Sequence, residues 1–119
     1  MATLTGEICV ACRRDSPKVT DEEVAELKPQ IPDWDLTNSD GIFRLERSFK
    51  FKNFSDALDF TEKVGRQADE EDHHPRITLE WGRVSVDWWT HKIRGLHRND
   101  FIMAAKTDAI YAEASKINE

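Results

Sequence analysis

Hydrophobic and polar residues alternate with a period of two along two stretches of the chain, as they do in half-buried β-strands. The first stretch extends from Trp34 to Phe51 and is interrupted by NSDG at positions 38–41, a composition typical of a hairpin turn. The second extends from Ile77 to Trp88 and turns at WGR, positions 81–83. We therefore predict two β-hairpins. One face of the strand that ends the first hairpin is expected to carry Phe43, Leu45, Phe49 and Phe51, with Arg47 interrupting it.

Three other segments have the helical period of about 3.6 residues. Positions 20–23 (TDEE) resemble a capping box and begin a short helix, which Pro29 and Pro32 end. Asn53 is placed to cap a second helix at about 54–71, and a third helix is predicted at about 98–117. The buried stripe of the second helix is expected to consist of Phe54, Leu58, Thr61, Val64 and Ala68, and that of the third of Phe101, Ala105, Ala109 and Ala112.

The order of these elements is helix, two strands, helix, two strands, helix. Hairpins without βαβ crossovers predict an α+β fold (α-β-β-α-β-β-α), in which a four-stranded antiparallel sheet has helices packed on one face. A chain of 119 residues has room for a single core. We expect one domain at 19–119, preceded at 1–18 by a flexible N-terminal extension that shows no clear periodicity.

Charge and hydropathy narrow the class of protein. The formal net charge of −6 argues against a nucleic-acid-binding protein, because such proteins neutralise phosphates with clustered basic residues. Lys92, Arg94 and Arg98 could form a local basic patch or a solvated rim around His91. No apolar run approaches the ~18 residues of a membrane span, and the N-terminus lacks the features of a secretory signal. We therefore expect a cytoplasmic protein that binds neither nucleic acid nor membrane.

The two cysteines of the chain form one C-x-x-C motif, Cys9 and Cys12. Such a motif is half of a zinc site or a redox pair, but the chain has no second cysteine pair to complete a four-thiolate site. No helix pattern follows at once to lower a thiol pKa. We interpret the motif as two thiols in the N-terminal extension.

Three histidines fall at two neighbouring ends of predicted strands. His73 and His74, followed by Pro75, begin the third strand, and His91 ends the fourth. The two ends are adjacent in an antiparallel hairpin, so the imidazoles are expected to lie close together. A set of groups that titrate near neutrality is suited to giving and taking protons. The alternative interpretation is that each histidine only forms hydrogen bonds at a strand end.

A zinc site is the other chemistry that this set permits. His73, His74 and His91 would suffice together with Asp72 or Asp100. However, consecutive residues of an extended segment point to opposite sides, so His73 and His74 do not easily converge on one ion. The His-x-x-x-His spacing of helical zinc sites is also missing from the sequence. We expect no metal.

The spacing of these residues is similar to the signature of a known family. D-x-x-x-H-H-P at 69–75, followed by Trp81, His91 and Asp100, resembles the pterin-4a-carbinolamine dehydratases (4a-hydroxytetrahydrobiopterin dehydratases). The resemblance covers the chain from about Val19 to the C-terminus, and the fold that it implies agrees with the periodicity. Further matching positions are Trp34 in IPDWDL, the FKFKNF stretch at 49–54, Thr90-His91 and Gly95-Leu96.

The resemblance implies a hydro-lyase, a 4a-hydroxytetrahydrobiopterin dehydratase that takes part in pterin cofactor recycling. It would remove water from a 4a-hydroxytetrahydropterin and leave quinonoid dihydropterin, without a cofactor. His73, His74 and His91 are then the catalytic residues: His73 and His91 form the acid/base pair, and His74 contacts and orients the ring. Which of the two imidazoles is the acid stays open.

The resemblance also implies a binding site around these histidines. Trp34 could cover the flat pterin or pack in the core, and Asp69 or Asp72 could act on a neighbouring histidine. Two departures from the family are present: His97 stands where relatives commonly have a Ser or Thr cap, and Trp88-Trp89 is a bulkier pair. The implied substrate-binding residues are His73, His74, Pro75, Thr90, His91, Lys92, Ile93 and Trp34, and the supporting residues are Asp69, Asp72 and Asp100.

Partners follow from the family alone. The resemblance implies a small-molecule pterin substrate, a homodimer or homotetramer, and functional coupling to a phenylalanine hydroxylase. The alternative function on the same fold is a protein-binding module, either a transcriptional dimerisation cofactor or an assembly factor. An interaction role would not need three histidines, so the enzyme is favoured.

Overall fold

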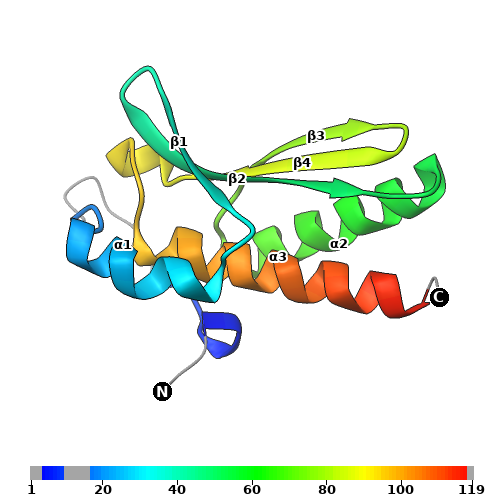
Figure 1. Ribbon diagram of the computed structural model, residues 1–119, viewed down its shortest axis with the longest axis horizontal. Coiled ribbons are helices and arrows are strands. Elements are labelled where there is room, and N and C mark those ends of the chain that lie inside the picture. Colours follow the sequence, from blue (N-terminus) through cyan, green and yellow to red (C-terminus); the bar gives the residue numbers. More distant parts are fainter. Residues whose placement is uncertain (1–3, 10–16, 118–119) are drawn as a thin grey trace.

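Three α-helices cover one face of a four-stranded sheet in the computed structural model, which describes residues 4–9 and 17–117 (Figure 1). This two-layer arrangement confirms the predicted α+β fold. The helices are α1 (Asp21–Leu27), α2 (Phe54–Glu71) and α3 (Arg98–Ile117), and the strands are β1 (Asp35–Ser39), β2 (Ile42–Lys50), β3 (Arg76–Glu80) and β4 (Arg83–Trp88). Short 3-10 turns are η1 (Leu4–Gly6), η2 (Lys28–Gln30) and η3 (His91–Ile93).

The sheet has the order β1-β2-β4-β3 and is antiparallel throughout. Both predicted hairpins are present, and the central pairing of β2 with β4 joins them. The β1–β2 turn is formed by Asp40 and Gly41, whose φ angles of 53° and 81° are both positive, as a two-residue type I′ turn requires. Asn38 closes this turn, because its side-chain oxygen accepts a hydrogen bond from Gly41 N at 3.0 Å.

Helix α1 begins with the predicted capping box. Thr20 Oγ1 accepts from Glu23 N at 3.1 Å, and Glu23 Oε1 accepts from Thr20 N at 3.0 Å.

None of the helices in the described part of the chain is both long enough and apolar enough to cross a membrane.

The core lies between the sheet and the helices. On α2 and α3, the residues that face this core differ in part from the predicted buried stripes. On α2, Phe54 and Leu58 are 43% and 46% exposed, whereas Ala57 and Phe60 are buried together with the predicted Val64 and Ala68. The helix is therefore rotated from the predicted orientation, because Phe60 packs against Phe49 of β2 with ring centroids 4.8 Å apart.

On α3, Phe101 and Ala105 are buried as predicted, but Ala109 and Ala112 are exposed. The first turns of this helix are buried on several sides, including Ile102, Met103 and Ala104, because they lie between the sheet and the N-terminal segment. On β2, Phe43 is 48% exposed since the tip of the β1–β2 hairpin extends beyond the helical layer (Figure 1).

The start of the chain makes specific contacts over the residues that the structure describes there, while the flexible extension expected at 1–18 stays a prediction. η1 packs against α3, and Leu4 is buried in the core with 1% of its surface exposed. Gln30 Oε1 accepts a hydrogen bond from Leu4 N at 3.1 Å. Cys9 is half-buried, with its Sγ 3.9 Å from Asn99 O, whereas Cys12 lies outside the described residues. The interpretation of the C-x-x-C motif thus stays a prediction.

A partly buried polar cluster connects the loop before β1 to α3. Asp108 Oδ1 accepts hydrogen bonds from Trp34 Nε1 at 2.8 Å and from Arg47 Nη1 at 2.6 Å. Burial raises the pKa of Asp108 above its usual value, although both hydrogen bonds act in the opposite direction. The cluster explains why Arg47 interrupts the apolar face of β2: its guanidinium is the counter-charge of this carboxylate.

The raised pKa gives a prediction about stability. A carboxyl whose pKa is higher in the folded chain binds protons more readily there, so its contribution to the free energy of unfolding falls as pH rises through that pKa. We expect the stability advantage of the wild-type chain over Asp108→Asn to shrink as pH is raised above 3.8, the ordinary pKa of an Asp side chain. Urea unfolding of both chains at several pH values measures this difference. An advantage that grows with pH would contradict the assignment.

Candidate active site

The two adjacent histidines lie in the short segment between the end of α2 and the start of β3. Asp72 ends the helix in the left-handed conformation, with φ 50°, which Asp tolerates better than most residues. His73 N then donates to Ala68 O at 3.1 Å, which closes the helix terminus. The chain leaves the helix at this point, and His73 and His74 precede β3 with Pro75 half-buried after them.

His73 is a buried histidine held by a carboxylate. It is 8% exposed, its Nε2 is 2.6 Å from Asp100 Oδ1, and its ring lies parallel to that of Trp88 with centroids 5.8 Å apart. An ionised carboxylate only accepts hydrogen bonds, so the hydrogen-bond network assigns the proton to Nε2. In the neutral ring, Nδ1 is then left as the acceptor, which is the nitrogen that can take up a proton.

Asp100 is the centre of this network and is fully buried in the first turn of α3. Its Oδ2 accepts from Thr90 Oγ1 at 2.8 Å and from His97 N at 2.9 Å. One side chain therefore links the segment before β3, the segment after β4 and the start of α3. Three of the predicted site residues, His73, Thr90 and Asp100, are brought together in this way.

His97 caps the start of α3, at the position where the resemblance led us to expect a Ser or Thr. Its Nδ1 accepts a hydrogen bond from Asn99 N at 3.1 Å, while its own N–H donates to Asp100. The two contacts form a reciprocal cap of the kind made by a capping box. The substitution at this position thus leaves the helix start closed.

His74 has a separate and exposed partner. Its Nε2 is 2.9 Å from Asp69 Oδ1, which lies on the last turn of α2. The side chains of His74 and Asp69 are 56% and 81% exposed, so this pair is accessible to solvent. His73 and His74 therefore form hydrogen bonds with different carboxylates. Asp72, beside them, ends α2 through its left-handed backbone conformation.

His91 lies in η3, after β4. Its ring contacts the ring of Trp89, with centroids 4.4 Å apart, and the residue is exposed. Backbone hydrogen bonds between Thr90 and Gly95, at 2.8 and 3.4 Å, close the loop that carries it. Within this loop Lys92 is exposed and Ile93 is buried.

The register of β3 with β4 relates these segments to each other. Arg76 pairs with Asp87, so the residues before β3 and those after β4 leave the hairpin at the same end. Trp88 is the last residue of β4, and Trp89 follows it, so their side chains point in opposite directions. The ring of His73 lies against Trp88 and that of His91 against Trp89, so the two imidazoles share one end of the hairpin but each contacts its own tryptophan. Their predicted closeness to each other stays a prediction.

Trp34 is placed in the core, away from the histidines. It is 1% exposed, and its indole Nε1 donates a hydrogen bond to Asp108, which lies further along α3 than Asp100. Its ring packs edge-on to Phe49 with centroids 5.9 Å apart. A side chain so buried has no free face to cover a ligand, so we do not retain Trp34 as a substrate-binding residue.

Arg44 is a site neighbour that sequence reasoning missed. Its guanidinium carbon lies 4.1 Å from the centroid of the Trp89 ring, the ring that His91 contacts. Leu45 pairs with Trp88, so Arg44 and Trp89 are the next residues across the same two strands. The signal that could have found Arg44 is this register, which depends on the pairing of two hairpins.

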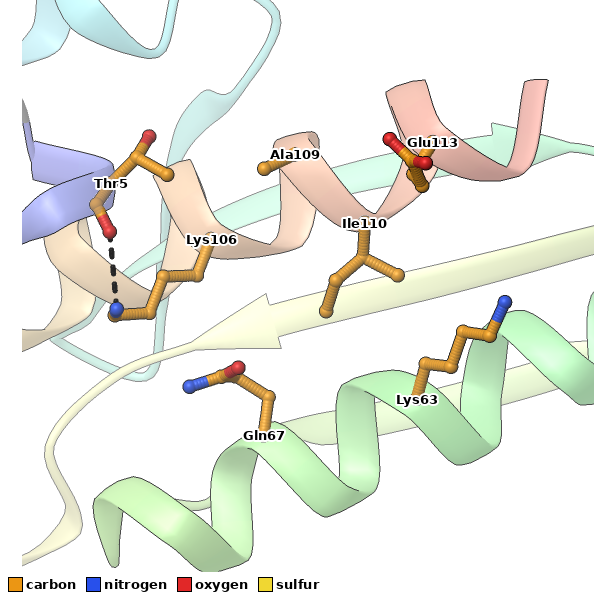
Figure 2. Close-up of a pocket in the computed structure, with 7 residues that line it drawn as sticks. All are labelled: Thr5, Lys63, Gln67, Lys106, Ala109, Ile110 and Glu113. Carbon is orange, nitrogen blue, oxygen red and sulfur yellow. Dashed lines mark hydrogen bonds between the residues drawn. The ribbon is translucent and has the colours of Figure 1, made fainter. Parts of the chain in front are cut away.

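Two surface grooves are lined by other residues than the histidines. One, of about 440 Å³, runs between α2 and α3 (Figure 2) and is lined by Thr5, Lys63, Gln67, Lys106, Ala109, Ile110 and Glu113. The other, of about 330 Å³, lies beside the β1–β2 hairpin and is lined by Lys18, Val19, Asp21, Val24, Leu36, Gly41, Phe43, Arg94, Gly95 and Leu96. Neither groove is lined by a histidine. Among residues 4–9 and 17–117, no group of three or more His, Cys, Asp and Glu side chains is arranged to hold a metal ion.

Comparison with known proteins assigns the chain to one family. The sequence model described as pterin 4 alpha carbinolamine dehydratase matches residues 17–110. A protein of Nitrosococcus oceani, named "Putative pterin-4-alpha-carbinolamine dehydratase", is 54% identical over 110 residues, which cover 92% of this chain and 97% of that protein. The chain belongs to the pterin 4 alpha carbinolamine dehydratase family, which confirms the resemblance seen in its sequence.

Two solved structures have the same architecture. The crystal structure of a transcriptional coactivator/pterin dehydratase from Brucella melitensis is 35% identical, with a TM-score of 0.71 over 80% of this chain and 99% of that chain. A pterin dehydratase-like protein, described as a RuBisCO assembly factor in the alpha-carboxysome, is 18% identical, with a TM-score of 0.57 over 66% of this chain and 89% of that chain. The second likeness shows the fold alone.

Proposed function

We propose that this protein removes water from a 4a-hydroxytetrahydropterin and releases quinonoid dihydropterin, with histidines as general acid and base. Family membership and the name of the Nitrosococcus relative support pterin carbinolamine dehydratase activity. The observation that carries the histidine mechanism is the buried pair of His73 and Asp100, in which a carboxylate sets the tautomer of the ring.

The reaction needs one acid and one base. The C4a–O bond breaks, and the hydroxyl leaves as water after it accepts a proton from the acid. The N5–H bond is broken by the base, and its electron pair forms the C4a=N5 double bond. One proton is given and one is taken, so neither a redox change nor a cofactor is required, and positioned side chains in such roles contribute about 10²–10⁴-fold.

We assign the acid/base pair to His73 and His91. His73 presents Nδ1 as its free nitrogen, because Nε2 donates to Asp100. His74 contacts and orients the ring, and its exposed pairing with Asp69 leaves it accessible to a ligand. Pro75, Thr90, Lys92 and Ile93 are proposed to form the walls of the binding site, with Thr90 and Ile93 acting through the backbone because their side chains are buried.

The proposed context is the cytoplasm, where a phenylalanine hydroxylase would supply the hydroxylated pterin. The protein is proposed to act as a homodimer or a homotetramer. These proposals follow from the family.

The test is a direct assay of dehydration. A 4a-hydroxytetrahydropterin is generated in the presence of the intact chain, and the appearance of quinonoid dihydropterin is followed by absorbance in a stopped-flow instrument. The proposed function predicts a rate well above that of buffer. A rate equal to that of buffer would replace it with the protein-binding alternative, a transcriptional dimerisation cofactor or an assembly factor.

A further inference from the structure

The described residues at the start of the chain, Leu4–Cys9, lie across the first turns of α3. Leu4 fills a core position, and Lys106 of α3 donates from Nζ to Thr5 O at 3.1 Å (Figure 2). Glu7 N donates back to Leu4 O at 3.0 Å, which closes the short turn. The segment is therefore held at a defined position on the helix.

Glu7 makes the strongest polar contact of this segment. Its two carboxylate oxygens accept from Nε and Nη2 of Arg98 at 2.9 and 2.7 Å, a two-point contact of the kind that fixes direction as well as distance. Arg98 is the first residue of α3. A cation there opposes the helix macrodipole, and the carboxylate of Glu7 offsets that unfavourable charge.

The opposite side of the same helical turn carries the candidate site. Asp100, two positions after Arg98, is fully buried and holds His73 and Thr90. Cys9 adds a contact between the segment and Asn99, which lies between these two residues. The first turn of α3 is thus held from the solvent side by the N-terminal segment and from the core side by the His73 network.

We propose that Leu4–Cys9 is a strap that positions the active site, in which Glu7, through Arg98, holds α3 where Asp100 orients His73. The role of the strap in catalysis rests on the proposed function, whereas its effect on His73 does not. The strap precedes residues 17–110, the part of the chain that matches the family. Glu7 is a positioning residue, because it acts through Arg98 and Asp100.

The test compares Glu7→Ala with Glu62→Ala. Glu62 is a matched control, because it also accepts two hydrogen bonds from one arginine, Arg66, but lies on the exposed surface of α2. Glu7→Ala is expected to shift the ring ¹⁵N resonances of His73, which report its tautomer, and to leave those of His91 unchanged. It is also expected to lower kcat by about 3- to 10-fold with KM changed by less than about 2-fold, since a small displacement of a catalytic group slows the chemical step. Glu62→Ala should do neither.

A reversed pair separates positioning from general loss of stability. Glu7→Arg combined with Arg98→Glu restores the ion pair with the charges exchanged, and it should return the His73 resonances and kcat toward wild type. If Glu7→Ala behaves like Glu62→Ala in both measurements, the strap has no positioning role. If the intact chain does not dehydrate the substrate at all, the proposed function fails, and the His73 resonances alone decide whether the strap positions the ring.

Discussion

Replacing His73 by alanine is expected to lower kcat for dehydration by about 10²–10⁴-fold, the range typical of a lost general acid or base. The reason is structural: His73 is the histidine whose tautomer is set by a buried carboxylate, so its Nδ1 is prepared to exchange a proton. Stopped-flow absorbance on the variant and the intact chain measures the loss. Circular dichroism confirms that both are folded.

His74→Ala is the matched control for this experiment. His74 is the neighbouring residue but is exposed and paired with Asp69, so its removal should act mainly on KM. A His73→Ala chain that keeps more than about a tenth of the wild-type kcat would remove His73 from the acid/base pair, since such groups contribute about 100-fold or more.

Replacing Asp100 by asparagine should have the second largest effect. Asparagine keeps the shape but has one acceptor atom, which can serve Thr90 and His97, and its amide N–H would then face His73 Nε2. His73 would have to move its proton to Nδ1 and lose the free acceptor. We expect kcat to fall by about 100-fold, because the wrong tautomer removes the free acceptor nitrogen of His73 without disturbing the rest of the site.

Asp100→Ala should also destabilise the fold. Two buried donors, His73 Nε2 and Thr90 Oγ1, and the partly buried His97 N lose their acceptor in this variant. Each buried group left unsatisfied costs about 1–3 kcal/mol. We expect the free energy of unfolding to fall by at least about 2 kcal/mol in urea titrations. For the loss of kcat in Asp100→Asn, the control is Asp69→Asn, which makes the same change in the carboxylate of the exposed pair with His74. Equal loss of kcat in Asp69→Asn and Asp100→Asn would contradict the special role of Asp100.

Much of the fold could be predicted from the sequence because its signals are local. The capping box at Thr20, the turn at 38–41 and the end of the first helix at its prolines are each contained in a few neighbouring residues. The predicted alternation also survives along β3, where Ile77 and Leu79 are half-buried between exposed neighbours. Such features depend little on what packs against them.

The positions whose burial differed from the prediction are those that depend on tertiary packing. Phe54 and Leu58 have a helical spacing that suits a buried stripe, but α2 turns Phe60 toward Phe49 instead. Leu4 is a single apolar residue in a segment without periodicity, so nothing local indicates that it fills a place in the core. Both outcomes are set by contacts with residues far away in the chain.

The sequence predicted which residues belong to the candidate site better than it predicted the contacts that these residues make. The signature named His73 and Asp100, which are 27 positions apart in the sequence and share a hydrogen bond. It did not indicate that Arg44 covers Trp89, because that contact requires the register of β2 with β4. Trp34 matched the family position, yet its burial beside Asp108 could only be seen in three dimensions.

A crystal structure of the intact chain with a bound dihydropterin tests the central claim most directly. The account predicts that the N5 and C4a edge of the ring lies beside His73, His74 and His91, with a ring nitrogen of His73 or His91 within about 2.6–3.2 Å of N5 or directly bridged to it by one water. A ring bound instead in the groove beside the β1–β2 hairpin, in contact with none of the three histidines, would contradict it.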